Sequence, residues 1–127
     1  MIRTVLVVDD SDTVRRMLRW VLSPLGLRIL EAPNGVLALE TLDREPVHLV
    51  VADLNMPVMD GIELVRAIRA VPARAGLPVI MLTTEQRELD VESAIKAGAN
   101  LYLTKPSTPA LIREKILALL DGTEAKA

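Results

Sequence analysis

Hydrophobic positions along the chain fall into two patterns that alternate from one end to the other. Short apolar runs of strand length recur five times, and the stretches between them space their apolar residues three or four positions apart. The runs are typical of strands buried on both faces of a parallel sheet, and the spaced stretches are typical of covering helices. The pattern therefore predicts an α/β, doubly wound (βα)5 fold. The predicted strands lie in TVLVV, LRILEA, HLVVAD, LPVIMLTT and NLYLTK.

Short polar residues mark the starts of four predicted helices, because their side chains can accept hydrogen bonds from first-turn amides. These candidate caps are Ser11 or Asp12, Asn34, Asp60 and Thr108. The helix between the fourth and fifth strands is predicted to end at Gly98. Its apolar positions are Leu89, Val91, Ala94 and Ile95. Trp20 falls off the apolar stripe of the first helix, so we expect its ring to be partly exposed.

Composition narrows the class of protein. The 127 residues are half hydrophobic, which is enough for one domain with its own core. The net charge is −2 with no basic cluster, so nothing indicates a nucleic-acid partner. The chain has no Cys, no signal-peptide run and no apolar stretch near the ~20 residues of a membrane span. We expect one cytoplasmic domain over residues 1–121, a short tail over 122–127 and no membrane partner.

Charged or hydroxyl side chains end four of the five predicted strands. Asp9 and Asp10 follow the first strand, Asp53 the third, Thr83 the fourth and Lys105 the fifth. Because ligands bind at the carboxyl ends of parallel strands, we expect these side chains together at the mouth of the sheet rather than in its core. Three carboxylates need a cation, and an all-oxygen site with few protein ligands favours Mg²⁺ over softer metals.

These residue types suit phosphoryl chemistry. An Asp carboxylate can attack phosphorus to form an aspartyl phosphate, while Lys105 supplies positive charge and Thr83 a hydrogen-bond donor. Each residue also has an ordinary structural explanation: Asp9 and Asp10 as charge at a helix N-terminus, Thr83 as a cap and Lys105 as a solvated turn. Their coincidence at four strand ends favours the phosphoryl site. His48, at the opposite end of the third strand, is expected to be a surface or loop residue.

Two motifs, DLNMPVMDG and GANLYLTKP, resemble those of the receiver domains of two-component response regulators. With VLVVDDSDTVRRML and VIMLTTE, the resemblance covers nearly the whole chain and is strongest to single-domain, chemotaxis-type (CheY-like) receivers. It implies a flavodoxin-like fold with five parallel strands in the order 2-1-3-4-5. It also implies a phosphorylation-activated switch that a histidine kinase phosphorylates stoichiometrically, not an enzyme.

The resemblance assigns a role to each residue at the mouth of the sheet. Asp53 would be the phosphoacceptor. Asp10 and Asp53 would bind Mg²⁺ directly together with the backbone carbonyl of Asn55, and Asp9 would act through the water shell of the ion. Lys105 would pair with the phosphoryl oxygens, and the peptide that follows it would be cis.

The resemblance also implies a way for the signal to leave. Thr83 would be the switch hydroxyl that moves toward the phosphate, and Tyr102 the aromatic residue that turns inward with it. The partner would be a flagellar switch protein or a phosphorelay protein. It would bind a face that carries Arg87, Val91, Ile95, Tyr102, Leu111 and Lys115.

The chain departs from the family pattern beside the site. Ser107 stands where the family very often has Phe, so we expect weaker packing behind the turn. Thr84 stands where a smaller Ala is common, which would narrow access to the phosphate. Asn55 and Glu85 occupy positions that modulate the lifetime of the phosphoryl group in the family.

Three other classes of protein compete with this interpretation. A haloacid-dehalogenase-type phosphatase needs a second Asp where this chain has Asn55. A flavodoxin-like cofactor carrier needs a phosphate loop after the first strand, where DDSDT would repel phosphate. The third alternative is a non-phosphorylated pseudo-receiver used as a scaffold, against which the complete set of acidic, hydroxyl and Lys residues argues.

Overall fold

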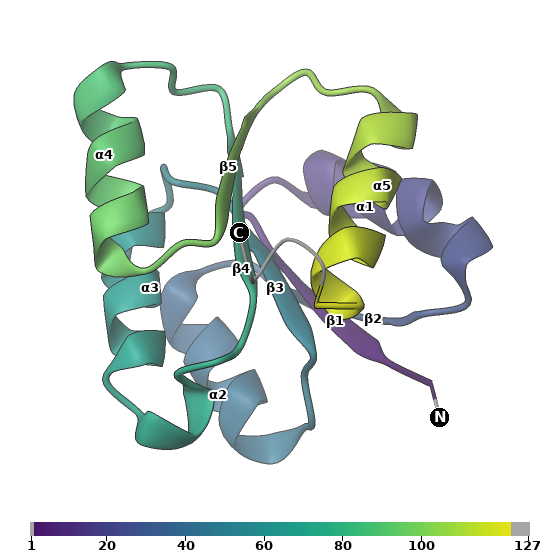
Figure 1. Cartoon of the computed structure of the whole chain (residues 1–127), viewed down its shortest axis with the longest axis horizontal. Helices are drawn as coiled ribbons and strands as arrows, with labels where there is room; N and C mark the ends of the chain where they lie inside the picture. The colour runs from purple at the N-terminus through teal and green to yellow at the C-terminus, as the bar shows by residue number, and fades with distance from the viewer. Residues whose placement is uncertain (1, 123–127) are drawn as a thin grey trace.

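In the computed structural model, which describes residues 2–122, five parallel strands form one sheet with helices on both faces (Figure 1). The strands are β1 (Thr4–Val8), β2 (Arg28–Ala32), β3 (Leu49–Ala52), β4 (Val79–Thr83) and β5 (Leu101–Thr104). The helices are α1 (Asp12–Leu22), α2 (Gly35–Arg44), α3 (Gly61–Arg69), α4 (Glu88–Ala97) and α5 (Pro109–Leu120). The strand order is β2-β1-β3-β4-β5, which confirms the predicted fold. Of the predicted tail, only Gly122 lies within the described residues.

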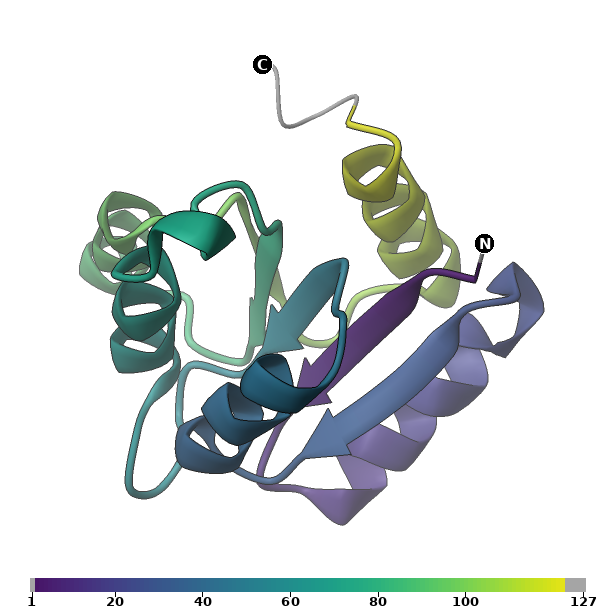
Figure 2. The same ribbon diagram turned by 90° about the horizontal axis from the view of Figure 1, so that it is seen from below.

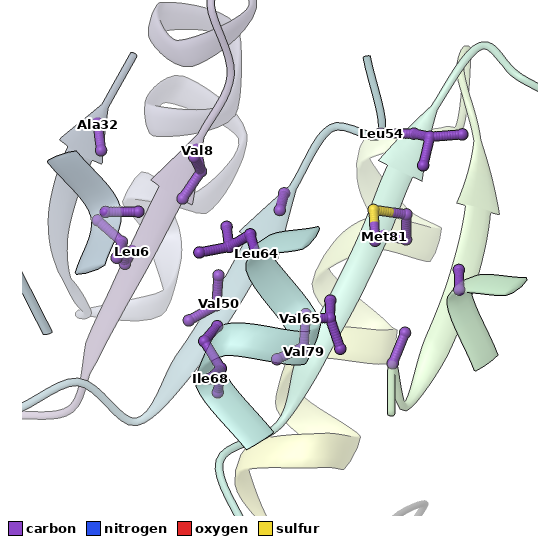
Figure 3. Close-up of a cluster of buried hydrophobic side chains, with 14 residues drawn as sticks. Leu6, Val8, Ala32, Val50, Leu54, Leu64, Val65, Ile68, Val79 and Met81 are labelled. Carbon is purple, nitrogen blue, oxygen red and sulfur yellow. The ribbon is translucent and has the colours of Figure 1, made fainter. Parts of the chain in front are cut away.

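Side chains of the central strands alternate between two cores, one on each face of the sheet. Val5 and Val7 of β1 pack with α1 and α5, whereas Leu6 and Val8 pack with α2, α3 and α4. Figure 3 shows the second of these cores, in which Leu64 of α3 lies over the strands. Burial of such side chains contributes ~1.5–3 kcal/mol each. The turned view in Figure 2 shows the two helical layers on either side of the sheet.

Side-chain caps begin the helices as the sequence predicts. The Ser11 hydroxyl, not Asp12, accepts a hydrogen bond from Val14 N at the start of α1. Asn34 and Thr108 cap α2 and α5 in the same way. Asp60 and Glu63 form a reciprocal capping box at the start of α3. These caps fix where each helix leaves the loop that follows a strand.

Helix α4 leaves apolar side chains exposed. Leu89 is 76% exposed and Ile95 is 46% exposed, although both belong to the apolar positions of the predicted helix. Only Ala94 of this helix is buried, and α4 packs against α3 and β5. Trp20 is 70% exposed, which confirms the expectation for that residue. Over residues 2–122, no helix has the length and apolar character needed to cross a bilayer.

A close backbone approach at Gly61 holds the loop after β3 against α3. The amide of Gly61 donates to the carbonyl of Leu54 at 2.8 Å. A Cβ at position 61 would overlap the backbone oxygen of Asp53 and approach the Met81 sulfur at 2.8 Å. Only glycine fits this approach, so Gly61 sets the position of the backbone that carries Asp53.

Val58, in the loop between β3 and α3, has φ +72° and an 82% exposed side chain. This left-handed conformation is unfavourable for a β-branched residue, and Asn tolerates it better. We expect Val58→Asn to raise the free energy of unfolding by about 0.5–1 kcal/mol, as measured by urea unfolding. Val36→Asn, at an exposed position with helical backbone in α2, is the control and should give no gain. An equal effect of both changes would contradict this explanation.

Candidate functional site

The carboxylates of Asp9, Asp10 and Asp53 meet at the carboxyl edge of the sheet. Each offers an oxygen, and the three oxygens lie within 4.8 Å of one another. Val8 pairs with Ala52 in the register of β1 and β3, so the residues that follow these two strands leave the sheet side by side. The amide of Asp53 also donates to the carbonyl of Val8 at 2.9 Å. The predicted gathering of these acids is therefore present.

Asp9 lies deeper than the sequence suggests. We expected the acids at the mouth of the sheet, yet the Asp9 side chain is almost fully buried, while Asp10 is exposed and Asp53 is half-buried. The charge of Asp9 is compensated locally. Lys105 Nζ lies 2.8 Å from Oδ2, and the amide of Ser11 donates to Oδ1 at 2.9 Å. A buried carboxylate is tolerated only with such partners.

Lys105 brings a positive charge to this site from the end of β5, an outer strand of the sheet. It follows β5, which is separated from β3 by β4, and its amide donates to the carbonyl of Thr83 at 2.8 Å. Its ammonium lies 2.8 Å from Asp9 and 3.7 Å from Asp53. The Lys105–Pro106 peptide is cis, as the resemblance implies. One ammonium is thus shared between two carboxylates.

The pKa of Asp53 is raised above its ordinary value. Burial is the largest cause, and the negative charge of Asp9 acts in the same direction. A hydrogen bond from Thr83 and the charge of Lys105 oppose it without cancelling it. Ionised Asp53 is therefore not fully compensated by the protein's own groups. A cation among the three carboxylates would supply the missing positive charge.

The chemistry of the donor set fits a hard divalent cation. The cluster offers only carboxylate oxygens, the donor type that Mg²⁺ and Ca²⁺ prefer. Asp10 is exposed, which leaves room for water and a phosphate oxygen around such an ion. Mg²⁺ is commonly held by one or two carboxylates, water and substrate phosphate.

A chain of hydrogen bonds joins the site to Tyr102. Thr83 is fully buried, and its hydroxyl accepts from the amide of Glu85 at 3.3 Å. The Tyr102 hydroxyl donates to the carbonyl of Glu85 at 2.8 Å, and burial raises the pKa of that hydroxyl. The Asn55 side-chain amide donates to Glu85 Oε1 at 2.9 Å. Sequence reasoning singled out Glu85 for its position but missed these contacts, because a loop side chain has no periodic signal.

The residues of the predicted partner face lie on or next to α4, β5 and α5. Figure 1 shows α4 and α5 on either side of β5. Arg87 precedes α4 and pairs with Asp90 at 2.9 Å. Val91 and Ile95 line a shallow groove on α4. Tyr102, Leu111 and Lys115 occupy β5 and α5, and Leu111 is 36% exposed. Leu89 adds an exposed apolar side chain at the start of α4.

The remaining singled-out residues surround the site or lie far from it. The Ser107 hydroxyl donates to the carbonyl of Thr104 at 2.6 Å, and a cavity lies beside it. Thr84 is exposed. His48 lies in the loop before β3, where its Nδ1 accepts from the amide of Thr4 at 2.9 Å. It belongs to the opposite edge of the sheet.

Several known proteins are similar to this chain in sequence, in structure or in both. The chain is 44% identical to the chemotaxis protein CheY1 of Helicobacter pylori over 121 residues, which is 94% of this chain and 98% of that protein. It is 45% identical over 113 residues to a chemotaxis protein CheY homolog of Campylobacter jejuni, with 87% of each chain covered. The structure matches that of Vibrio cholerae chemotaxis protein CheY4 with a TM-score of 0.88 and 31% identity, covering 94% of this chain and 99% of that one.

A CheY-like response regulator receiver domain protein from Methanospirillum hungatei matches with a TM-score of 0.90 and 27% identity over the whole of both chains. Residues 5–117 match the family described as the response regulator receiver domain. This match includes the three carboxylates and all of the strand residues except Thr4. The chain therefore belongs to the response regulator receiver domain family, and it is a receiver of the CheY type.

Proposed function

We propose that this protein is a signalling switch that accepts one phosphoryl group from a histidine kinase on Asp53. The observation that carries the proposal is the position of Asp53, whose carboxylate lies 3.7 Å from Lys105 Nζ and within 4.8 Å of two other carboxylates. Membership of the receiver family supports it. The protein would act stoichiometrically in the cytoplasm, not as an enzyme with turnover.

We assign a Mg²⁺ site to the same cluster. Asp10 and Asp53, with the backbone carbonyl of Asn55, would hold the ion directly, and Asp9 would act through its water shell. When bound, the ion neutralises charge on the carboxylates and on the phosphoryl group that is transferred. This charge would keep Asp53 ionised at neutral pH despite the burial that raises its pKa.

The transfer itself uses the protein's own side chains. An ionised oxygen of Asp53 attacks phosphorus, a P–O bond forms, and the P–N bond to the imidazole of the kinase breaks. The ammonium of Lys105 lies on the side of Asp53 where it can pair with a phosphoryl oxygen. Asp9 holds that ammonium in place through its 2.8 Å contact.

Phosphorylation would then change the loop that contains Glu85. The phosphoryl oxygens attract the Thr83 hydroxyl, which now accepts from the amide of Glu85. Moving that hydroxyl alters the support of Glu85, whose carbonyl holds Tyr102. The result is a population shift between two packed states that changes the face of α4, β5 and α5. A flagellar switch protein or a phosphorelay protein would read this face.

A non-phosphorylated scaffold is the alternative to this function. Against it stands the complete arrangement of three carboxylates, a hydroxyl and an ammonium at one edge of the sheet. A scaffold would not need an acceptor carboxylate whose pKa is raised and whose charge is only partly compensated.

Asp53 is expected to be the residue that gains the phosphoryl group. Incubation with acetyl phosphate and Mg²⁺ should add the mass of one phosphoryl group, as measured by intact mass spectrometry after rapid quenching. Asp53→Asn should abolish the gain, because it removes the nucleophile, and chelation of Mg²⁺ should abolish it in the unchanged protein. Asp12→Asn, at an exposed acid outside the cluster, is the matched control. No gain in the unchanged protein with Mg²⁺ would favour the scaffold.

In the absence of divalent cations, the free energy of unfolding should depend on pH through Asp53. Because the pKa of Asp53 is raised on folding, its protonated form favours the folded state, and this contribution is lost as pH rises through the folded-state pKa. Asp53→Asn should therefore unfold at higher urea than the unchanged protein at pH 7, by about 1 kcal/mol. The difference should shrink as pH falls through the raised pKa of Asp53, because the carboxyl becomes neutral like the amide that replaces it. A difference that is constant with pH would contradict this account.

Substitutions on the partner face should weaken binding of the downstream protein. Tyr102→Ala should weaken binding of the phosphorylated protein to its flagellar switch or phosphorelay partner by roughly 30-fold, because buried aromatic anchors dominate such interfaces. Lys115→Ala should weaken it less, as a charge at the rim. Trp20→Ala, on α1 and outside this face, should leave the affinity unchanged. Calorimetric titration measures all three, and unchanged binding of both face variants would exclude this surface.

A further inference from the structure

A small apolar cavity lies behind the acidic site, between α1 and α5. Its volume is about 170 Å³. Val14 and Met17 of α1, Leu82 of β4 and Ile112 of α5 form its walls, and the turn 105–107 closes one side. Figure 1 shows α1 and α5 on the same face of the sheet, and Arg113 of α5 donates to the carbonyl of Val21 in α1 at 3.1 Å.

The polar groups of this turn are already bound elsewhere. The Lys105 ammonium lies 2.8 Å from Asp9, so its methylene stem faces the cavity while its charge faces the carboxylates. The Ser107 hydroxyl donates to the carbonyl of Thr104 at 2.6 Å. Pro106 has no amide hydrogen. A water molecule needs two to four polar partners to be held in a cavity, and these walls do not offer them.

The size and chemistry of the cavity select its occupant. A dry cavity of about 150 Å³ lined by apolar side chains can bind benzene or xenon. The cavity in this protein has a similar volume and a thioether at its mouth, where Met17 is 43% exposed. Sulfur makes favourable contacts with aromatic rings. A charged ligand would lose its hydration there without gaining a partner, because the one ammonium in the lining is paired.

We infer that this cavity is a binding site for a small uncharged aromatic molecule, between benzene and indole in size. The ring would lie against Leu82 and Ile112 and against the stem of Lys105. No carboxylate belongs to the lining of this cavity, and binding can be measured on the unphosphorylated protein. Loss of indole binding and loss of phosphorylation are therefore separate results.

Indole is the probe for this site. Titration of the full chain, labelled at its Ile, Leu, Val and Met methyl groups, should give saturable NMR shifts centred on Val14, Met17, Leu82 and Ile112. The expected Kd is about 1 mM or lower, in keeping with the affinity per atom of very small ligands. Absence of saturable shifts at these methyl groups up to the solubility of indole would overturn the inference.

Variants distinguish this cavity from other surfaces. Ser107→Phe places a ring in the cavity and should weaken indole binding by about tenfold or more. Ala110→Phe adds the same ring at an exposed position of α5 outside the lining and should leave the Kd unchanged. If Ser107→Phe does not fold, Val14→Phe, which adds a ring from the α1 wall of the same cavity, decides the result. Equal binding by the cavity-filling variant and the unchanged protein would place indole elsewhere and reject the site.

Discussion

A buried carboxylate beside a lysine ammonium holds the functional edge of this sheet together. Asp9 is only 3% exposed, and an unpaired charge at that depth would cost several kcal/mol. Lys105 Nζ, at 2.8 Å, and the amide of Ser11, at 2.9 Å, remove that cost. The pair connects the end of β1 with the end of β5, across the two strands that lie between them. Moving the ammonium away would leave the buried Asp9 carboxylate unpaired, so the ammonium stays near Asp53.

The same constraint leaves the site with unbalanced negative charge. Three carboxylates lie within 4.8 Å of one another, and one ammonium is shared between two of them. Burial raises the pKa of Asp53, and its hydrogen bond to Thr83 and the charge of Lys105 do not cancel that effect. Under the proposed function, a hard cation would supply the missing positive charge and would keep coordination positions open for a phosphoryl oxygen.

Lys105 also lies between two different environments. On one side its ammonium contacts the carboxylates, and on the other its stem forms part of an apolar cavity beside Ser107. The opposite flank of the site is the hydrogen-bonded loop of Glu85, which contacts both Asn55 and Tyr102. Under the proposed function, a change at Asp53 would reach α4 through that loop, whereas the cavity lies on the α1 and α5 side of the sheet.

The sequence by itself determined the fold class, the strand positions and most helix starts, because hydrophobic patterns and capping residues are local signals. It also determined that Asp9, Asp10 and Asp53 meet, because parallel strands end at the same edge of a sheet. Tertiary structure alone decided the depth of Asp9, the contacts of Glu85 and the exposure of Leu89. Helical spacing shows that α4 has an apolar side, but the area that its neighbours cover depends on packing between distant segments. The cavity beside Ser107 has the same origin, since its walls come from α1, β4, α5 and the turn after β5.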